Sequence, residues 1–399
     1  MNDFNAEAQR RRGWEVRKAK YLWQQITAPS SSLRKIGLEN IESFTGRFIE
    51  SASQFEGSGI AFEKGDILYG KLRPYLAKVW IAEFAGNAVG DFFVYRLNDG
   101  INARYLHYYM RSPQFTEAAN ASTYGAKMPR VSADYMANLP IPLPPLPEQK
   151  EIVAYLDAET GRIDKAIAAE EKMIALLQER REIVINEAVA PHDGWEVRRL
   201  SQVILSLRTG LNPRRFFELN PDNATNYYVT IRELRNGKIV FSKDTDRIND
   251  QALSLCKNRS RLEKGDILFS GTGSIGEVAL IRESPTNWNI KEGIYALKPN
   301  CKRIHTKYLV YVLVSPAFLA LARARAVGTA VRSIPMKDLA ILPIPLPPLP
   351  EQEAIVERLD RETGKIDRAI DVKRRQIELL RERRQIVIDE VVTGKVSCA

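Results

Sequence analysis

The sequence predicts an α+β protein in which two tandem domains are joined by two long helices that pair as a coiled coil within the chain. Three observations lead to this fold class. The eleven residues LPIPLPPLPEQ occur at 139–149 and again at 342–352. Each copy is followed by about forty residues of helical pattern, and residues 148–189 and 351–392 are identical at 24 of 42 positions. A long segment of divergent sequence precedes each copy. We therefore expect two similar surfaces held at a fixed separation.

The repeat gives the expected domain boundaries. The first domain and its proline-rich linker take residues 1–147, and the first helix takes 148–190. The second domain takes 191–350, and the second helix with a C-terminal tail takes 351–399. GWEV at 13–16 and 194–197, and EKGDIL at 63–68 and 263–268, mark equivalent points of the two domains. The second domain has roughly twenty additional residues between these two motifs.

Each domain is expected to mix short strands with helices. Apolar runs after a Lys-Gly turn, at 66–69 and 266–270, predict strands, as do residues 92–97 and 293–297. Residues 105–110 and 308–314 predict short helices. The longest apolar run, 308–322, is shorter than the roughly 18 residues of a membrane span, and Pro316 interrupts it. With three widely spaced cysteines and no apolar leader, the sequence favours a soluble protein of the reducing cytoplasm.

The proline-rich box is expected to be an extended, stiff connector. Each proline removes an N–H donor and fixes φ, which excludes a helix or a central strand. Pro147 and Pro350 are expected at the first helical position, followed by Glu148 and Glu351 in the favourable first turn. The alternative is a proline-rich ligand for an aromatic groove, because Pro142 and Pro145 have PxxP spacing.

The helical segments follow a heptad for five repeats, which predicts coiled-coil packing of each helix with the other. The central isoleucines at position a are Ile167, Ile174, Ile370 and Ile377. The central d position is Glu170 in one copy and Lys373 in the other. In an antiparallel pair these opposite charges fall in adjacent layers, which favours pairing within one chain over a homodimer. The alternative is that both charges extend to solvent. A helix of about 42 residues spans roughly 63 Å, or about 18 base pairs of DNA.

The charge is concentrated in the divergent segments. Lys and Arg number 59 and Asp and Glu 49, a net charge of +10 with a pI near 9.4. Residues 1–147 carry 18 basic and 14 acidic side chains, and residues 191–350 carry 24 and 14. Residues 148–190 carry 6 and 10, and residues 351–399 carry 11 of each. The two domains are therefore the candidates for contacting phosphate, and the helices are the expected scaffold.

The motifs of common enzymes are absent from the sequence. GTGSIG at 271–276 matches GxGxxG, but the following residues predict a strand rather than a helix, which argues against a nucleotide site. A plain turn, or a tight loop with free backbone N–H groups near a phosphate, remain the alternatives. No Walker A, HExxH, GxSxG or EF-hand pattern occurs, and the three histidines have no metal-ligand cluster near them in sequence. We expect no catalytic residue, no metal and no cofactor on this chain.

Basic side chains near aromatic and small polar residues are the candidates for DNA binding, because Arg reads guanine edges while Lys and hydroxyl groups hold phosphate. In the first domain they are Lys71, Arg73, Tyr75, Lys78, Tyr124, Lys127 and Arg130. In the second they are Arg208, Arg214, Arg215, Ser270, Thr272, Ser274, Arg325, Thr329 and Arg332. A solvated basic surface is the alternative for each residue taken alone.

With these features the chain resembles the DNA specificity (S) subunit of bacterial type I restriction-modification systems. The resemblance rests on the duplicated PIPLPPLPEQ box entering a long helix, the paired GWEV motifs, and the segments GDILYGKLRPYL and GDILFSGTGSIG, and it covers nearly the whole chain. It implies two target recognition domains that bind the halves of a bipartite, asymmetric site in double-stranded DNA. It also implies that the helices pair antiparallel as a spacer and that the chain itself is not catalytic. Two methylation (M) subunits and motor-nuclease (R) subunits would be partners, carrying the S-adenosylmethionine and ATP chemistry.

Overall fold

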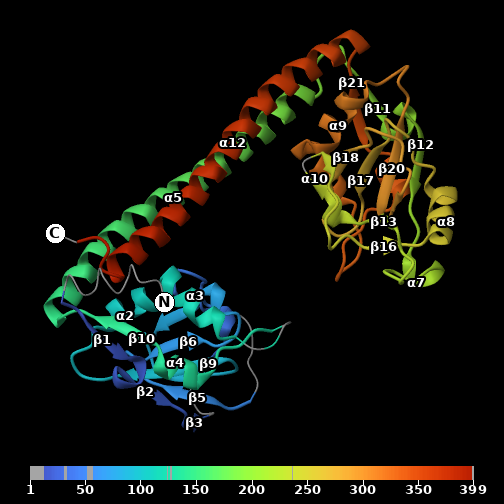
Figure 1. The fold of residues 1–399 in the computed structure, drawn as a ribbon. Helices are drawn as coiled ribbons and strands as arrows, with labels where there is room; N and C mark the ends of the chain where they lie inside the picture. Colours follow the sequence, from blue (N-terminus) through green and yellow to red (C-terminus); the bar gives the residue numbers. More distant parts are fainter. Residues whose placement is uncertain are drawn as a thin grey trace. The chain divides into compact units, whose positions relative to one another are not determined.

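The computed structural model describes residues 13–397 except 31–33, 52–56, 124, 126–127 and 236. The chain divides into two compact units (Figure 1). Unit 1 comprises residues 1–171 and 374–399, and unit 2 comprises residues 172–373. Each unit thus combines one divergent segment with part of both long helices.

Unit 1 is built on two four-stranded sheets. The first has the order β2-β9-β6-β7 and is antiparallel throughout, with β2 (Trp23–Ile26), β9 (Phe92–Leu97), β6 (Ile67–Gly70) and β7 (Val79–Ile81). The second has the order β3-β5-β8-β4, with β3 (Pro29–Ser30), β5 (Gly59–Phe62), β8 (Gly86–Ala88) and β4 (Lys35–Ile36). The helices are α2 (Ala103–Met110), α3 (Pro113–Ala121) and α4 (Ala133–Asn138). The strands predicted at 66–69 and 92–97 and the helix predicted from 105 are confirmed.

Unit 2 repeats the first of these sheets and changes the second. The order β12-β20-β17-β18 is formed by β12 (Ile204–Thr209), β20 (Ile294–Pro299), β17 (Ile267–Ser270) and β18 (Val278–Leu280). The second sheet has three strands, β16 (Arg247–Ile248), β13 (Asn226–Val229) and β19 (Trp288–Ile290). A separate hairpin of β14 (Leu234–Arg235) and β15 (Lys238–Ile239) packs beside β18. The helices are α6 (Leu200–Val203), α7 (Pro213–Phe216), α8 (Asp250–Ser260), α9 (Thr306–Val314), α10 (Pro316–Ala324) and α11 (Met336–Ala340). Helix α8 lies between GWEV and EKGDIL, where the sequence predicted the additional residues.

The proline-rich box forms a strand in each unit. β10 (Pro140–Leu143) pairs antiparallel with β1 (Glu15–Lys18), which contains the end of GWEV, and β21 (Pro343–Leu346) pairs in the same way with β11 (Glu196–Arg199). The expected extended conformation is confirmed, but the box is paired rather than a free connector. Prolines tolerate this arrangement because they occupy every second position of a two-stranded sheet, where alternate residues need no donor to the partner.

The long helices α5 (Leu146–Val189) and α12 (Leu349–Val392) are continuous through Gly161 and Gly364. Each begins one residue before the expected first position, so the proline is the second helical residue. The predicted heptad is confirmed on the basis of burial, since none of its a and d residues is exposed. Ile370 and Ile377 are buried, and Ile167 and Ile174 are partly buried.

Within each unit α5 and α12 run side by side in opposite directions (Figure 1). In unit 1 the start of α5 shares a core with the end of α12, through Leu156 and Ile388 among others. In unit 2 the end of α5 shares a core with the start of α12, as shown by Val184 and Leu359. Pairing within one chain and the antiparallel direction are thus confirmed. Glu170 and Lys373 belong to different units, and their attraction stays a prediction.

A repeated junction fixes the strands and short helices of each unit to a long helix. In unit 1 the Tyr108 hydroxyl donates to Asp157 Oδ1 at 2.7 Å and lies 3.1 Å from Thr160 Oγ1. In unit 2 Tyr311 makes the same contacts with Asp360 and Thr363, at 2.7 and 3.4 Å.

Among the described residues, no single helix is long and apolar enough to cross a membrane, and α9 and α10 satisfy that test only as a pair bent by 64°.

Candidate nucleic-acid interface

In unit 1 two segments that are far apart in sequence form one surface beyond the end of β6. Leu72 and Arg130 form an isolated β-bridge, Arg73 N donates to Pro129 O at 2.9 Å, and Val131 N donates to Lys71 O at 3.1 Å. We call residues 71–75 and 128–130 the first loop surface. The structure thus brings together candidates that the sequence placed more than fifty residues apart.

The candidates on this surface differ in how freely they reach solvent. Arg73 and Tyr75 are exposed, Tyr75 by 45%. Arg73 has a left-handed backbone, with φ of 53°, which is a strained conformation for a residue other than glycine. Arg130 is exposed, but its Nη2 donates to Asp91 Oδ2 at 2.9 Å. Arg73 and Tyr75 are therefore the most available side chains.

Two lysines of the predicted set are held by the protein itself. Lys71 Nζ lies over the Phe93 ring, 4.7 Å from its centroid, and partial burial lowers the pKa of Lys71. Lys78 Nζ donates to Leu38 O at 2.7 Å, and burial also lowers its pKa. Lys78 therefore stabilises the fold rather than extending from the first loop surface. The predicted residues Tyr124 and Lys127 lie outside the described part of the chain.

Unit 2 has an equivalent surface beyond the end of β17. Thr272 and Ser333 form a β-bridge, and their hydroxyl oxygens are 2.8 Å apart. Gly273 N donates to Arg332 O at 2.8 Å. We call residues 271–276 and 327–333 the second loop surface. Arg332, Thr329 and Ser274 are exposed on it, and Arg325 is exposed just before it. The Nη2 of Arg332 also donates to Arg323 O at 3.0 Å.

The glycines of the second loop surface serve the turn itself. Gly273 and Gly276 have φ of +76° and +106°, and a Cβ on Gly271 would lie 2.2 Å from Tyr295 Cε2. The N–H groups of Gly271, Gly273 and Gly276 donate to Gly293 O, Arg332 O and Ser270 O. Since the three glycine amides are used inside the loop, the plain turn is favoured over a phosphate loop of free amides.

Ser270 and Arg208 contribute to the fold rather than to an open surface. The Ser270 side chain is fully buried, and its Oγ accepts from Glu277 N at 2.8 Å and from Gly276 N at 3.1 Å. Arg208 Nη1 donates to Arg261 O at 2.9 Å, at the C-terminal end of α8, where helix carbonyls lack partners.

Arg215 is exposed on α7, and the side chain of Arg214 lies outside the described part. The preceding strand places this segment near the second loop surface. Gly293 N donates to Thr209 Oγ1 at 3.3 Å, and a Cβ on Gly293 would lie 2.7 Å from Thr272 Oγ1. Arg215 therefore lies six residues beyond the end of β12, and that strand end adjoins the second loop surface.

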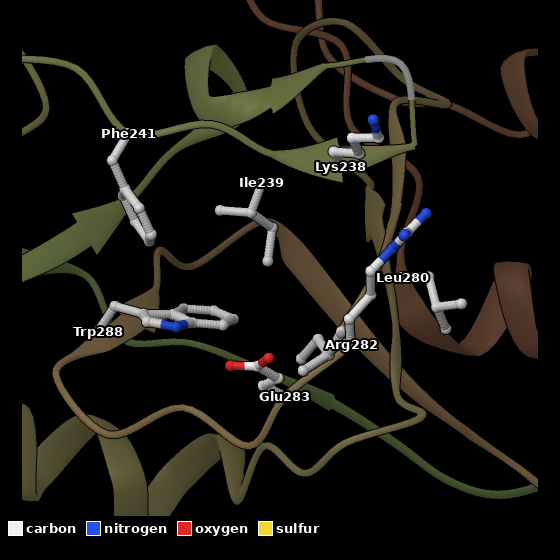
Figure 2. Close-up of a pocket in the computed structure, with 8 residues that line it drawn as sticks. Lys238, Ile239, Phe241, Leu280, Arg282, Glu283 and Trp288 are labelled. Atoms are coloured by element: carbon white, nitrogen blue, oxygen red, sulfur yellow. The ribbon is translucent and has the colours of Figure 1, made fainter.

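Unit 2 also has an aromatic hollow of about 400 Å³ that the sequence did not indicate (Figure 2). Phe241 and Ile239 lie above the indole of Trp288, and Glu283 lies beside it. The rings of Phe241 and Tyr227 are stacked with centroids 4.4 Å apart. Lys238 and Arg282 are exposed residues that line the same hollow. Only the tertiary fold joins these residues, because the β14–β15 hairpin packs beside β18.

No metal centre is formed in the described part of the chain, where no group of three or more His, Cys, Asp or Glu side chains could hold an ion. The two loop surfaces instead present arginine, tyrosine and hydroxyl groups on similar backbones. A family model for the type I restriction modification DNA specificity domain matches residues 40–177 and 192–380. The chain belongs to this family of specificity proteins.

Relatives of this specificity protein match most of its length. The EcoBI specificity subunit of Escherichia coli is 25% identical over an alignment of 323 positions, which covers 74% of this chain and 66% of that subunit. The MjaX specificity subunit of Methanocaldococcus jannaschii is 25% identical over an alignment of 425 positions, which covers 96% of this chain and 93% of that subunit. A chain from a structure of the type I R-M system, solved for its complex assembly and conformational transition, has a TM-score of 0.70. It shares 20% identity over 96% of this chain and 98% of that chain, which shows the fold.

The specificity protein thus has the family and fold that the sequence predicted. Its two loop surfaces are equivalent in the repeat but carry different side chains. The first presents Arg73 and Tyr75, whereas the second presents Ser274, Thr329 and Arg332. Different donors on similar backbones are suited to reading different base sequences.

Proposed function

We propose that this protein reads a bipartite, asymmetric site in double-stranded DNA, with one loop surface for each half-site. The observation that carries the proposal is the occurrence of two equivalent loop surfaces, one per unit, whose exposed side chains differ. The basic excess of the divergent segments supports it, because phosphate attraction supplies much of the affinity of a DNA-binding protein. The paired helices α5 and α12 would act as the spacer.

We further infer that the chain directs catalysis by partners without a reaction of its own. Two methylation subunits would bind S-adenosylmethionine, and motor-nuclease subunits would bind ATP. Membership of the specificity family supports this division of labour, and so do relatives that are themselves named specificity subunits. Purified chain that methylated or cut DNA alone would contradict it.

The test measures methylation and binding by the complex with its methylation subunits. The methylated adenines of the source genome give the bipartite site. We expect Arg73→Ala to weaken binding and alter only the half-site read by unit 1, and Arg332→Ala to alter only the other half-site. A lost base contact should cost roughly 1–3 kcal/mol of discrimination, whereas a lost phosphate contact should reduce the salt slope by about one.

Matched controls come from the repeat. Lys64→Ala and Lys264→Ala remove exposed charges at equivalent turns before β6 and β17, at the opposite strand ends from the loop surfaces. Both should retain affinity and specificity. Equal affinity for the cognate site and random duplex across a salt series would instead favour a non-specific DNA-binding protein or a coiled-coil scaffold.

A further inference from the structure

Unit 1 contains a polar cavity of about 200 Å³ where β7 and α2 meet the long helices α5 and α12. Residues from α2, from both long helices, from the segment around Gly46 and from residues 80–83, including the exposed Glu83, line it. The groups that matter are His107 on α2, Arg111 at the C-cap of α2, Thr160 and Asp164 on α5, and Arg384 on α12. The cavity plays no part in the proposed reading of DNA.

Two guanidinium groups are buried at this cavity. Arg111 is 3% exposed, and it donates to the carbonyl oxygens of His107 at 3.1 Å, Phe44 at 3.0 Å, and Thr45. In the described part of the chain it forms no ion pair with a carboxylate. Burial and the neighbouring Arg384 both lower the pKa of Arg111. A buried cation that is satisfied only by carbonyl dipoles is costly.

Arg384 is the second buried cation, with 8% of its side chain exposed. Its Nη1 donates to Phe44 O at 3.2 Å. Its Nε lies 3.3 Å from Asp164 Oδ1, but it makes no hydrogen bond there. The Asp164 carboxylate therefore offsets one of the two buried positive charges, those of Arg111 and Arg384. The other arginines at the cavity have their own partners, since Arg47 pairs with Glu42 and Arg104 with Asp157.

His107 adds an unused acceptor to the same cavity. Its ring is buried, and Nε2 lies 2.9 Å from Val79 O, which requires Nε2 to donate. In this tautomer Nδ1 accepts, and it is buried without a hydrogen-bond partner. Burial first, and then Arg111, depress the pKa of His107 far below its usual range, so the ring is neutral. The cavity thus offers a donor on Arg384, Nε, and an acceptor on His107, Nδ1, that make no hydrogen bond within the protein.

The equivalent corner of unit 2 lacks these features. There Arg181 Nε donates to Asp367 Oδ1 at 3.1 Å, which replaces the incomplete contact of Arg384 with Asp164. Val310 and Val314 occupy the positions of His107 and Arg111 in the repeat. The cation pair is therefore not a requirement of the shared fold.

We propose that the cavity of unit 1 binds hydrogen phosphate between Arg111 and Arg384, with its P–OH group donating to His107 Nδ1. A guanidinium matches an oxyanion geometrically, and the anion would supply negative charge to two buried cations of which Asp164 offsets only one. Sulfate offers the same charge but no hydroxyl donor at neutral pH, so it should bind more weakly. The bound anion would fasten α2 of unit 1 to α5 and α12.

The experiment titrates the full-length protein with sodium phosphate, sodium sulfate and sodium chloride at matched ionic strength. It follows the melting temperature and the ³¹P NMR linewidth. Phosphate at five times its Kd should raise the Tm of unit 1 by roughly 2–4 °C and then saturate. Millimolar concentrations keep general salting-out small. Equal responses to the three salts would overturn the proposal.

Variants locate the effect. Arg111→Val copies unit 2 and should abolish the phosphate response, and His107→Val should abolish the preference for phosphate over sulfate. Arg111→Lys keeps the charge if the valine variant folds poorly, and it should weaken phosphate binding. Lys64→Ala and Arg73→Ala should respond like wild type, because neither lies at the cavity. An unchanged phosphate response in both Arg111 variants, or its loss in Arg73→Ala, would refute the site.

Discussion

Replacing Gln149, the last residue of the repeated box, tests how the strands and short helices of unit 1 are fixed to the long helix α5. The Gln149 side chain is 1% exposed. Its Oε1 accepts from the backbone N–H of Asn102, the N-cap residue of α2, at 2.8 Å. Its Nε2 donates to Pro144 O, also at 2.8 Å. One side chain therefore joins α2, the proline-rich strand and α5.

The expected loss follows from the groups that Gln149→Leu leaves behind. Leucine fills a similar volume, but the N–H of Asn102 and the carbonyl of Pro144 lose their partner. Each unsatisfied buried group costs roughly 1–3 kcal/mol, so we expect a loss of about 3 kcal/mol. For a unit of this size that corresponds to a fall in Tm of roughly 6–12 °C. Gln352→Leu should cost somewhat more, because Gln352 contacts three backbone groups, on His305, Pro347 and Arg303.

Calorimetry and urea unfolding measure the loss, and hydrogen exchange assigns it. The amide of Asn102 should exchange faster in Gln149→Leu than in wild type. The matched control is Gln178→Leu, because Gln178 is exposed on the same helix. A Gln149→Leu protein within about 0.5 kcal/mol of the control would show that the buried amide contributes nothing to the junction.

Three further predictions concern pH, glycine positions and spacing. His107 is neutral in the folded protein because burial depresses its pKa. Its contribution to the free energy of unfolding is therefore complete above the unfolded pKa of about 6.5 and is lost as the pH falls below that value. Urea unfolding at pH 7.5 and 5.5 should show this loss, up to about 1.4 kcal/mol per pH unit, and His107→Val should lack it. Gly271→Ala should destabilise by about 1–3 kcal/mol through its clash with Tyr295, while Gly161→Ala, with open space around it on α5, should stabilise by up to about 1 kcal/mol in thermal unfolding. Inserting one heptad into both α5 and α12 should lengthen the gap of the methylated site by about three base pairs without changing either half-site, and an unchanged gap would exclude the spacer role.

Much of the fold was readable from local sequence. The strand after each Lys-Gly turn, the strand at 92–97 and both long helices follow from short-range patterns, so they were predicted at nearly the right bounds. The pairing of β10 with β1 was missed. Proline argues against central strands, and nothing local shows that GWEV supplies a partner from more than a hundred residues away.

The candidate interface was only partly readable. Arg73, Tyr75 and Arg332 were chosen for residue type, and they lie exposed on or beside the loop surfaces. Lys78 and Arg208 have the same residue types, but their side chains are partly buried and bound to backbone carbonyls. Arg332 also donates to a carbonyl, that of Arg323, but it stays exposed. Composition cannot separate the exposed side chains from the partly buried ones, because burial depends on which parts of the folded chain surround each residue.

The sequence by itself determined the duplication, the two long amphipathic helices and the family, since these depend on repeated motifs and on a heptad period that any helix obeys. Only the tertiary structure decided which basic side chains are exposed, why the repeated box ends in glutamine, and where buried positive charge exceeds buried negative charge. The glutamine acts on Asn102 or His305, 47 residues earlier in each unit. The cavity at Arg111 and Arg384 joins residues 273 positions apart. Hydrogen bonds and charges act over a few ångströms of space, and only the folded chain fixes which residues meet at that range.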